Sequence, residues 1–113
     1  MSQPDKIRAF SKPIKVAEVN YTHFEMREAT VNDMFEAEME LARIGGGAHT
    51  PLMFNGEMMV RQLVSVSNDT GGNFAGPFTM NMLRAWGPRN YRALRAQQVE
   101  LDLLGEAVES DQD

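Results

Sequence analysis

The sequence predicts a small α+β domain in which an N-terminal β-hairpin is followed by three or four α-helices, so that the chain is mostly helical. Apolar and polar residues alternate over residues 22–27, as in a half-buried strand. From residue 31 onward, apolar residues recur at helical spacing, and clusters of glycine, proline and asparagine divide this part into helix-length segments. A chain of 113 residues suits one domain with a modest core.

The hairpin is expected from two short extended segments. Residues 14–19 form the first predicted strand, and Pro13 stands just before it, where a proline is tolerated. A turn near Asn20 would return the chain antiparallel into residues 22–28, although no Asn-Gly or Asp-Gly pair marks that turn. Because a two-stranded hairpin alone is marginally stable, it must pack on the helices or on another copy.

A capped helix is expected directly after the hairpin. The Thr30 hydroxyl can cap it, and the carboxylate of Asp33, three residues on, can reach back to the backbone of the cap. Glutamate is commoner than aspartate at that position, so the capping box is imperfect. The helix carries a broad apolar stripe, which in most helices faces the core: Val31, Met34, Phe35, Leu41 and Ala42. Gly45 ends the helix.

A second helix is predicted from Thr50 and Pro51, a cap followed by a proline at the first helical position. Its inner stripe is Leu52, Gly56, Met59, Leu63 and Val66, widened by Val60 and Val64. With Asn55 as an alternative cap, residues 50–54 would be a loop.

The rest of the chain predicts a loop and two more helices. Residues 68–73 are turn formers, and Thr79 can cap a short helix that carries Met82, Leu83 and Trp86. Pro88 begins the last helix, and Gly105 closes it. One face of this helix carries Tyr91, Leu94, Gln98, Leu101 and Leu104.

Both ends of the chain are predicted to lie outside the folded domain, which covers residues 13–105. Residues 1–12 contain a proline and several polar residues, so we expect a flexible arm. Residues 106–113 contain four acidic residues and no basic one, so we expect a disordered tail.

Composition limits the possible partners. The net charge is −5, and most of it lies in the tail, so neither part has the positive charge that nucleic-acid binding requires. No apolar run is long enough to cross a membrane, and the first 15 residues lack the apolar core of a signal peptide. The absence of cysteine suits a cytoplasmic protein and excludes thiolate chemistry. We therefore expect neither a nucleic-acid nor a membrane partner.

No motif in the sequence points to catalysis, a metal or a cofactor. His23 and His49 lie in different predicted elements, without the spacing of a metal site. The glycine triplet at residues 45–47 follows a helix and lacks the lysine of a phosphate-binding loop. Glu36, Glu38 and Glu40 alternate along a helix and favour a solvated face over paired carboxylates. We expect a non-enzymatic protein without cofactors.

Nine methionines make this composition unusual, because methionine fills cores but also lines adaptable binding surfaces. Met53, Phe54 and Met58 fall outside the inner stripe of the second helix, so an exposed patch there would mark a partner site or an oligomer face. A second candidate patch surrounds the later loop. The predicted partner-binding residues are Met53, Phe54, Met58, Met59, Phe74, Phe78 and Trp86.

The string MREATVNDMFEAE at residues 26–38 resembles the segment that marks the tail assembly chaperones of contractile-tailed, Mu-like and P2-like phages. In that family a short hairpin ends in a phrase of the type L-R-E-P-T-x-x-D-L, and helices follow. This chain departs from the phrase at two positions, with Ala29 in place of proline and Met34 in place of leucine. After residue 50 only the helical pattern and the size are similar.

The resemblance implies a non-enzymatic protein of the infected host's cytoplasm that takes part in virion assembly. Such a chaperone binds the tape-measure protein, helps to recruit tail tube subunits and is absent from the mature virion. Two alternatives stay open. One is a small structural virion protein, or other homo-oligomeric subunit, that assembles through the edge of its hairpin. The other is a small enzyme or ligand-binding domain.

Overall fold

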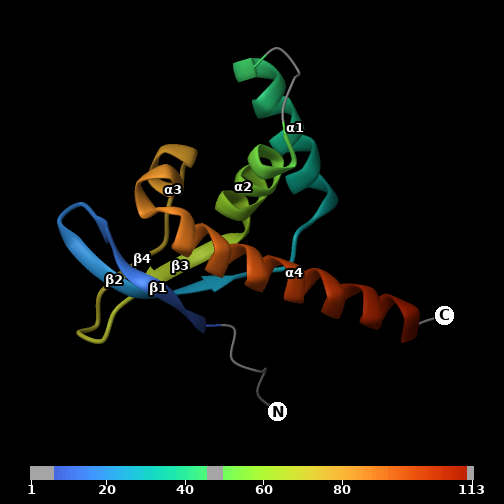
Figure 1. Ribbon diagram of the computed structural model, residues 1–113. Helices are drawn as coiled ribbons and strands as arrows, with labels where there is room; N and C mark the ends of the chain where they lie inside the picture. The colour runs from blue at the N-terminus through green and yellow to red at the C-terminus, as the bar shows by residue number, and fades with distance from the viewer. Residues whose placement is uncertain (1–6, 46–49, 112–113) are drawn as a thin grey trace.

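The computed structural model describes residues 7–45 and 50–111, and Figure 1 shows how their helices and strands are arranged. In chain order the elements are β1 (Ile7–Val16), β2 (Val19–Met26), α1 (Val31–Gly45), α2 (Pro51–Gln62), β3 (Leu63–Ser67), β4 (Asn73–Phe74), α3 (Met80–Trp86) and α4 (Pro88–Asp111). The strands form one antiparallel sheet in the order β1-β2-β3-β4, and about half of the chain is helical. The predicted α+β class, with an N-terminal hairpin and then helices, is confirmed.

The first strand begins earlier than predicted. β1 starts at Ile7, so the prediction of a flexible arm is wrong for residues 7–12, while residues 1–6 lie outside the described part of the chain. Phe10 stabilises this additional part of β1, because the Phe10 side chain is buried against the rings of Phe24 and Trp86.

The hairpin turn also lies earlier than predicted. Ala17 and Glu18 connect the strands, and their φ angles of 50° and 71° lie in the left-handed region. A two-residue connection with positive φ at both positions matches the twist of the flanking strands. Asn20, where the turn was expected, lies in β2 and pairs with Lys15 of β1.

Residues 63–67 form strand β3, although the sequence favours a helix there. Leu63 adopts an extended conformation directly after α2, and β3 then pairs antiparallel with β2, with Phe24 opposite Val66 and Met26 opposite Leu63. The valines of this segment favour a strand, and pairing with β2 satisfies backbone groups that a hairpin alone would leave open. The hairpin is thereby extended to a four-stranded sheet.

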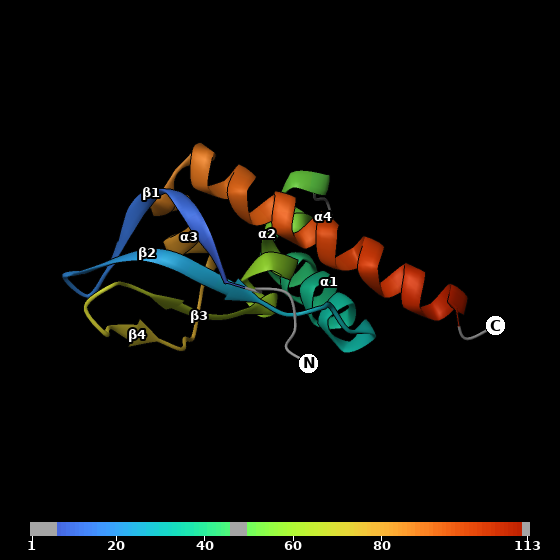
Figure 2. The ribbon, with the colours of Figure 1, turned by 90° about the horizontal axis from the view of Figure 1, so that it is seen from below.

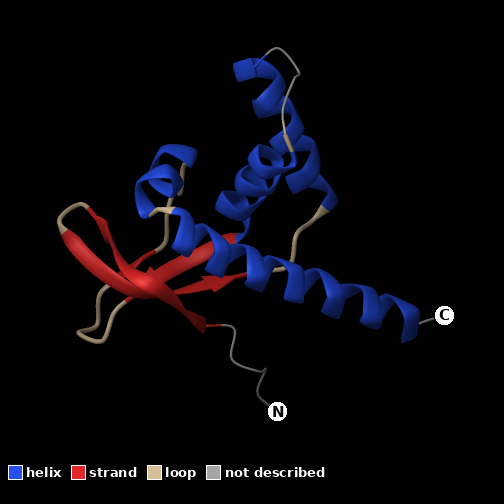
Figure 3. Ribbon diagram, in the orientation of Figure 1, coloured by secondary structure: helices blue, strands red, loops and turns tan. Residues whose placement is uncertain are grey.

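The helices gather on one side of the sheet (Figures 2 and 3), and the core lies between the two layers. Aromatic rings form its centre: the ring centroid of Phe10 lies 4.9 Å from that of Phe24 and 5.5 Å from that of Trp86. The remaining buried members are Ile14, Tyr21, Met26, Met59, Val60, Leu63, Val66, Leu83, Leu94 and Leu101. Helix α1 packs mainly against α2 and stands apart from this core (Figure 1).

Helix α4 runs along β1 and continues to Asp111. The predicted helix end at Gly105 and the predicted disorder of the tail are therefore wrong for residues 106–111, which extend the helix. Near its start, the Asn90 side chain accepts a hydrogen bond from the backbone N–H of Lys12 and donates one to its carbonyl, both at 3.0 Å. None of the described helices is long and apolar enough to cross a membrane.

Candidate functional site

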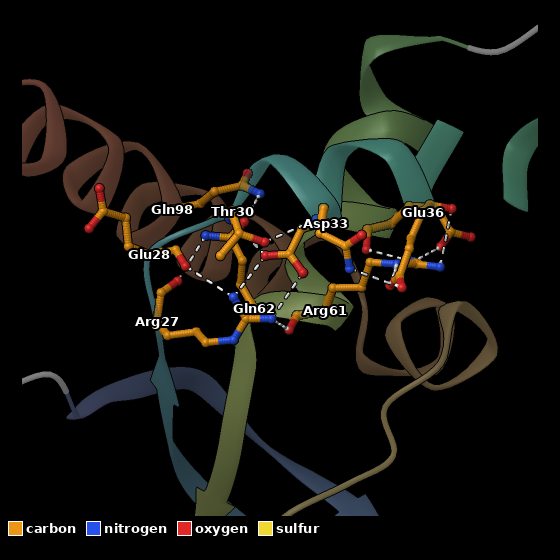
Figure 4. A network of polar contacts seen from close by, with 10 residues as sticks. Arg27, Glu28, Thr30, Asp33, Glu36, Arg61, Gln62 and Gln98 are labelled. Atoms are coloured by element: carbon orange, nitrogen blue, oxygen red, sulfur yellow. Dashed lines mark hydrogen bonds and ion pairs between the residues drawn. The ribbon is translucent and has the colours of Figure 1, made fainter. Parts of the chain in front are cut away.

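The corner between β2 and α1 contains the capping box that the sequence predicts. The backbone N–H of Asp33 donates to the Thr30 hydroxyl at 3.1 Å, and the backbone N–H of Thr30 donates to the Asp33 carboxylate at 2.8 Å. Arg27 completes the corner with two hydrogen bonds to the two oxygens of that carboxylate, at 2.7 and 3.0 Å (Figure 4). Aspartate serves here because Arg27 binds it in the bidentate geometry that suits a guanidinium and a carboxylate.

A chain of hydrogen bonds connects this corner to α2 and α4. Arg27 also donates to the carbonyl of Arg61 at 2.7 Å, and the Gln62 amide donates to the carbonyl of Arg27 at 2.9 Å (Figure 4). Gln98 of α4 then donates to the Gln62 side chain at 2.8 Å. Gln62 is completely buried, so these bonds satisfy its polar atoms. The network sets the position of α1 relative to the rest of the protein.

Asp33 is held in its charged form by this network. The hydrogen bonds from Arg27, helped by those from Thr30, lower the pKa of Asp33 to about 2, although burial acts in the opposite direction. Because the pKa of the folded state lies below that of the unfolded chain, the resulting stability is present above about pH 4 and is lost as the pH falls toward 2.

We expect Asp33→Asn to reduce this pH dependence. Between pH 5 and pH 2 the free energy of unfolding of the wild type should fall by about 2 kcal/mol more than that of the variant, because only the wild type must protonate Asp33. Urea titrations at both pH values measure the difference. Parallel pH profiles of the two proteins would contradict this role of Asp33.

Helix α1 faces the body of the protein with a narrow side and solvent with an apolar one. Asp33, Ala37 and Leu41, spaced by four residues, are its buried positions. Four of its large apolar side chains lie outside this buried side: Val31, Met34, Phe35 and Met39 are 62, 46, 62 and 70% exposed. We call these four residues the α1 face. The expectation that the stripe of this helix faces the core is therefore wrong except at Leu41, because α1 packs mainly on α2 and has no sheet beneath it.

A groove lies beside the α1 face, between α1 and α4. Its floor is formed by Phe54, Asn55 and Met58 of α2, with Met34 on the α1 wall and Gln98 on the α4 wall. This hollow has a volume of about 390 Å³, and a second one of about 330 Å³ shares Phe54 and Asn55 with it. We call the two together the α1–α4 groove.

Three of the seven predicted partner-binding residues are buried in the structure. Met58, Met59 and Trp86 are only 6, 0 and 8% exposed, so their prediction as an exposed patch is wrong. Met58 and Met59 are buried because α2 packs against α1, α3 and α4 and therefore buries more than one stripe. Trp86 of α3 is buried against the ring of Phe10.

The other four predicted residues are half-buried. Phe54 lines the α1–α4 groove, whereas Met53 lines hollows on the α3 side of α2. Phe74 and Phe78 stack edge-to-face at 5.4 Å and pack against the core. The predicted set is thus not brought together into one surface.

Val31, Met34 and Phe35 of the α1 face were missed as candidates because they were assigned to the apolar stripe of the helix, and Met39 was counted among the methionines without being assigned to a surface. The sequence contains one sign that this stripe is exposed, because the charged residue Glu38 falls among its apolar members on the same side of the helix.

The described residues offer no group of three His, Asp or Glu side chains that could hold a metal ion. His23 hydrogen-bonds the neighbouring Thr22 hydroxyl at 2.8 Å, and His49 lies outside the described residues, as do Gly46 and Gly47 of the glycine triplet. Glu36 and Glu40 form salt bridges with Arg61 and Arg43.

The residues of the site thus offer an exposed apolar helix surface beside an open groove. Comparison with known proteins finds no family model, no curated protein and no solved structure that matches this chain.

Proposed function

We propose that this protein is a phage tail assembly chaperone that binds the tape-measure protein in the host cytoplasm and aids assembly of the tail tube, without enzymatic activity and without remaining in the virion. The observation that carries the proposal is the α1 face, a set of large apolar side chains presented to solvent on one helix. Contiguous exposed apolar surface of this kind marks interaction sites. The resemblance of residues 26–34 to the family's phrase supports the same function, and the phrase spans the corner that positions α1.

The side chains of the α1 face suit a client that must be held and later released. Two of the four are methionines, whose flexible side chains adapt to different apolar partners. The α1 face spans residues 31–39 of α1, and a helix is a natural ligand for it, because ridges of side chains at three- and four-residue spacing pack into one another.

The alternative, a structural subunit that assembles through its hairpin edge, has less support. β1 is the outer strand of the sheet, but α4 lies along it and Asn90 occupies both backbone groups of Lys12. At the other edge, β4 consists of two residues. Neither edge offers a long row of free backbone groups for strand addition.

Co-expression with the tape-measure protein tests the proposal. We expect the tape measure to be insoluble alone and soluble with this chain, and light scattering to give the mass of a complex of the two. A chain that forms the same oligomer with and without the tape measure, and does not bind it, would contradict the chaperone function and favour the structural alternative.

A further inference from the structure

We infer that a second copy of this chain docks its α1 face into a hollow between α2, α3 and α4. The hollow has a volume of about 510 Å³, and we call it the α3 hollow. Its lining includes four large apolar or aromatic side chains and two arginines: Leu52, Met80, Leu83, Tyr91, Arg84 and Arg92. The inference follows from the exposure of this apolar lining and from the charges of the two surfaces.

The apolar lining of the α3 hollow is open to solvent. Leu52 is 64% exposed, and Met80 and Tyr91 are half-buried. The Tyr91 hydroxyl donates to the carbonyl of Leu52 at 2.8 Å, which ties the first turn of α2 to α4 and keeps this wall of the hollow in place. A large apolar side chain that enters from a partner would therefore bury Leu52 in a preformed depression.

The charge beside the α3 hollow is positive, although the whole chain carries −5. Residues 70–99 contain four arginines and no acidic residue, and Arg84 and Arg92 of this group line the hollow. Both side chains are exposed, and neither forms a salt bridge with another described residue. Arg84 donates one hydrogen bond, to the Asn81 side chain at 2.8 Å. Both guanidinium groups can therefore meet a carboxylate of a partner.

Helix α1 of a second copy offers the complementary surface. It contains four acidic residues and one arginine, and Phe35 and Met39 of its α1 face are 62 and 70% exposed. Glu38 falls among the apolar members of that side and is exposed. Glu36 and Glu40 are paired with arginines, whereas Glu38 has no salt bridge in the described ranges. An acidic amphipathic helix against a basic, apolar hollow combines apolar burial with charge complementarity.

The two surfaces differ from each other, so the contact is head-to-tail: one copy donates its α1 face and the other accepts it in its α3 hollow. A copy whose α1 face is held by a neighbour cannot present that face to a client. The client must then displace the neighbour, and the apolar surface stays covered until it does. This consequence rests on the proposed function, whereas the self-association itself does not.

Charge reversal across the contact tests the inference. Arg92→Glu and Glu38→Arg each place like charges at the contact, and the double variant Glu38→Arg/Arg92→Glu restores opposite charges. Arg89→Glu is the matched control, because it makes the same change at an exposed position of α4 outside the lining of the hollow. Sedimentation equilibrium at about 5 to 500 µM, without tape-measure protein, measures self-association. Circular dichroism confirms that each variant folds.

We expect the wild type and Arg89→Glu to self-associate equally, and each single reversal at the contact to weaken self-association by about tenfold. The double variant should recover most of that loss. A wild type that stays monomeric up to about 500 µM would overturn the inference, as would equal weakening by Arg89→Glu or a double variant as weak as the single ones. None of these results bears on the chaperone function, which fails only if the tape-measure protein does not bind.

Discussion

Replacing Phe35 and Met39 together with glutamine should weaken binding of the tape-measure protein by about 100-fold or more. Both side chains lie on the α1 face, 62 and 70% exposed, and burial of each at an interface contributes about 1.5 kcal/mol or more. Glutamine keeps the net charge and the helix propensity of α1 close to those of the wild type. The free energy of unfolding should therefore change by about 0.5 kcal/mol or less. Titration calorimetry and urea unfolding measure the two quantities.

Val99 and Leu103 provide the control for this experiment. They are 39 and 61% exposed on α4, so Val99→Gln/Leu103→Gln makes the same kind of change, apolar to amide, on another helix. This control variant should bind the tape measure as the wild type does. If it loses as much affinity as the α1 variant, the client is recognised by general apolarity and not by the α1 face.

Met59→Gln should destabilise the protein by about 3 kcal/mol or more. The side chain is completely buried among the residues of the core, so the change both removes apolar contact and buries an amide. For a domain of this size the melting temperature should fall by about 12 °C or more. Thermal unfolding followed by circular dichroism measures the shift.

Met39→Gln is the matched control, because it makes the same chemical change at a position that is 70% exposed. It should leave the melting temperature within about 2 °C of the wild type. A small effect of Met59→Gln would contradict the assignment of Met59 to the core and would revive its prediction as a partner-binding residue.

The sequence was sufficient to predict the elements whose signals are local. The capping box at Thr30 and Asp33 is a local pattern, and its two hydrogen bonds are found in the structure. The caps of α2 and α3 are formed by Thr50 and Thr79, whose hydroxyls accept from the backbone N–H groups of Met53 and Met82. Each of these signals depends on residues three positions apart, so no knowledge of the fold is needed.

The sequence was insufficient where the outcome depends on a distant partner. Residues 63–67 fit a helical stripe, but they form a strand because β2 offers an edge with which to pair. Gln62 carries no local signal of burial, and its buried position depends on Arg27 and Gln98, which lie 35 and 36 residues away.

The candidate site was predicted least well, because the spacing of apolar residues along a helix does not show whether another part of the protein covers them. Val31 and Phe35 have the spacing of core residues, and only the position of α1 outside the sheet layer leaves them exposed. Met58 and Trp86 show the opposite error. Met58 lies beside a predicted inner stripe and Trp86 beside the later loop, and neighbouring elements bury both.

The methionine methyl groups provide the most direct test of the claim that the client binds to the α1 face. In a sample labelled with ¹³C only at these methyls, addition of the tape-measure protein should shift or broaden the signals of Met34 and Met39. The signals of Met26 and Met59, which are completely buried in the core, should stay in place. Binding that leaves Met34 and Met39 unchanged, and perturbs methionines elsewhere, would contradict the account.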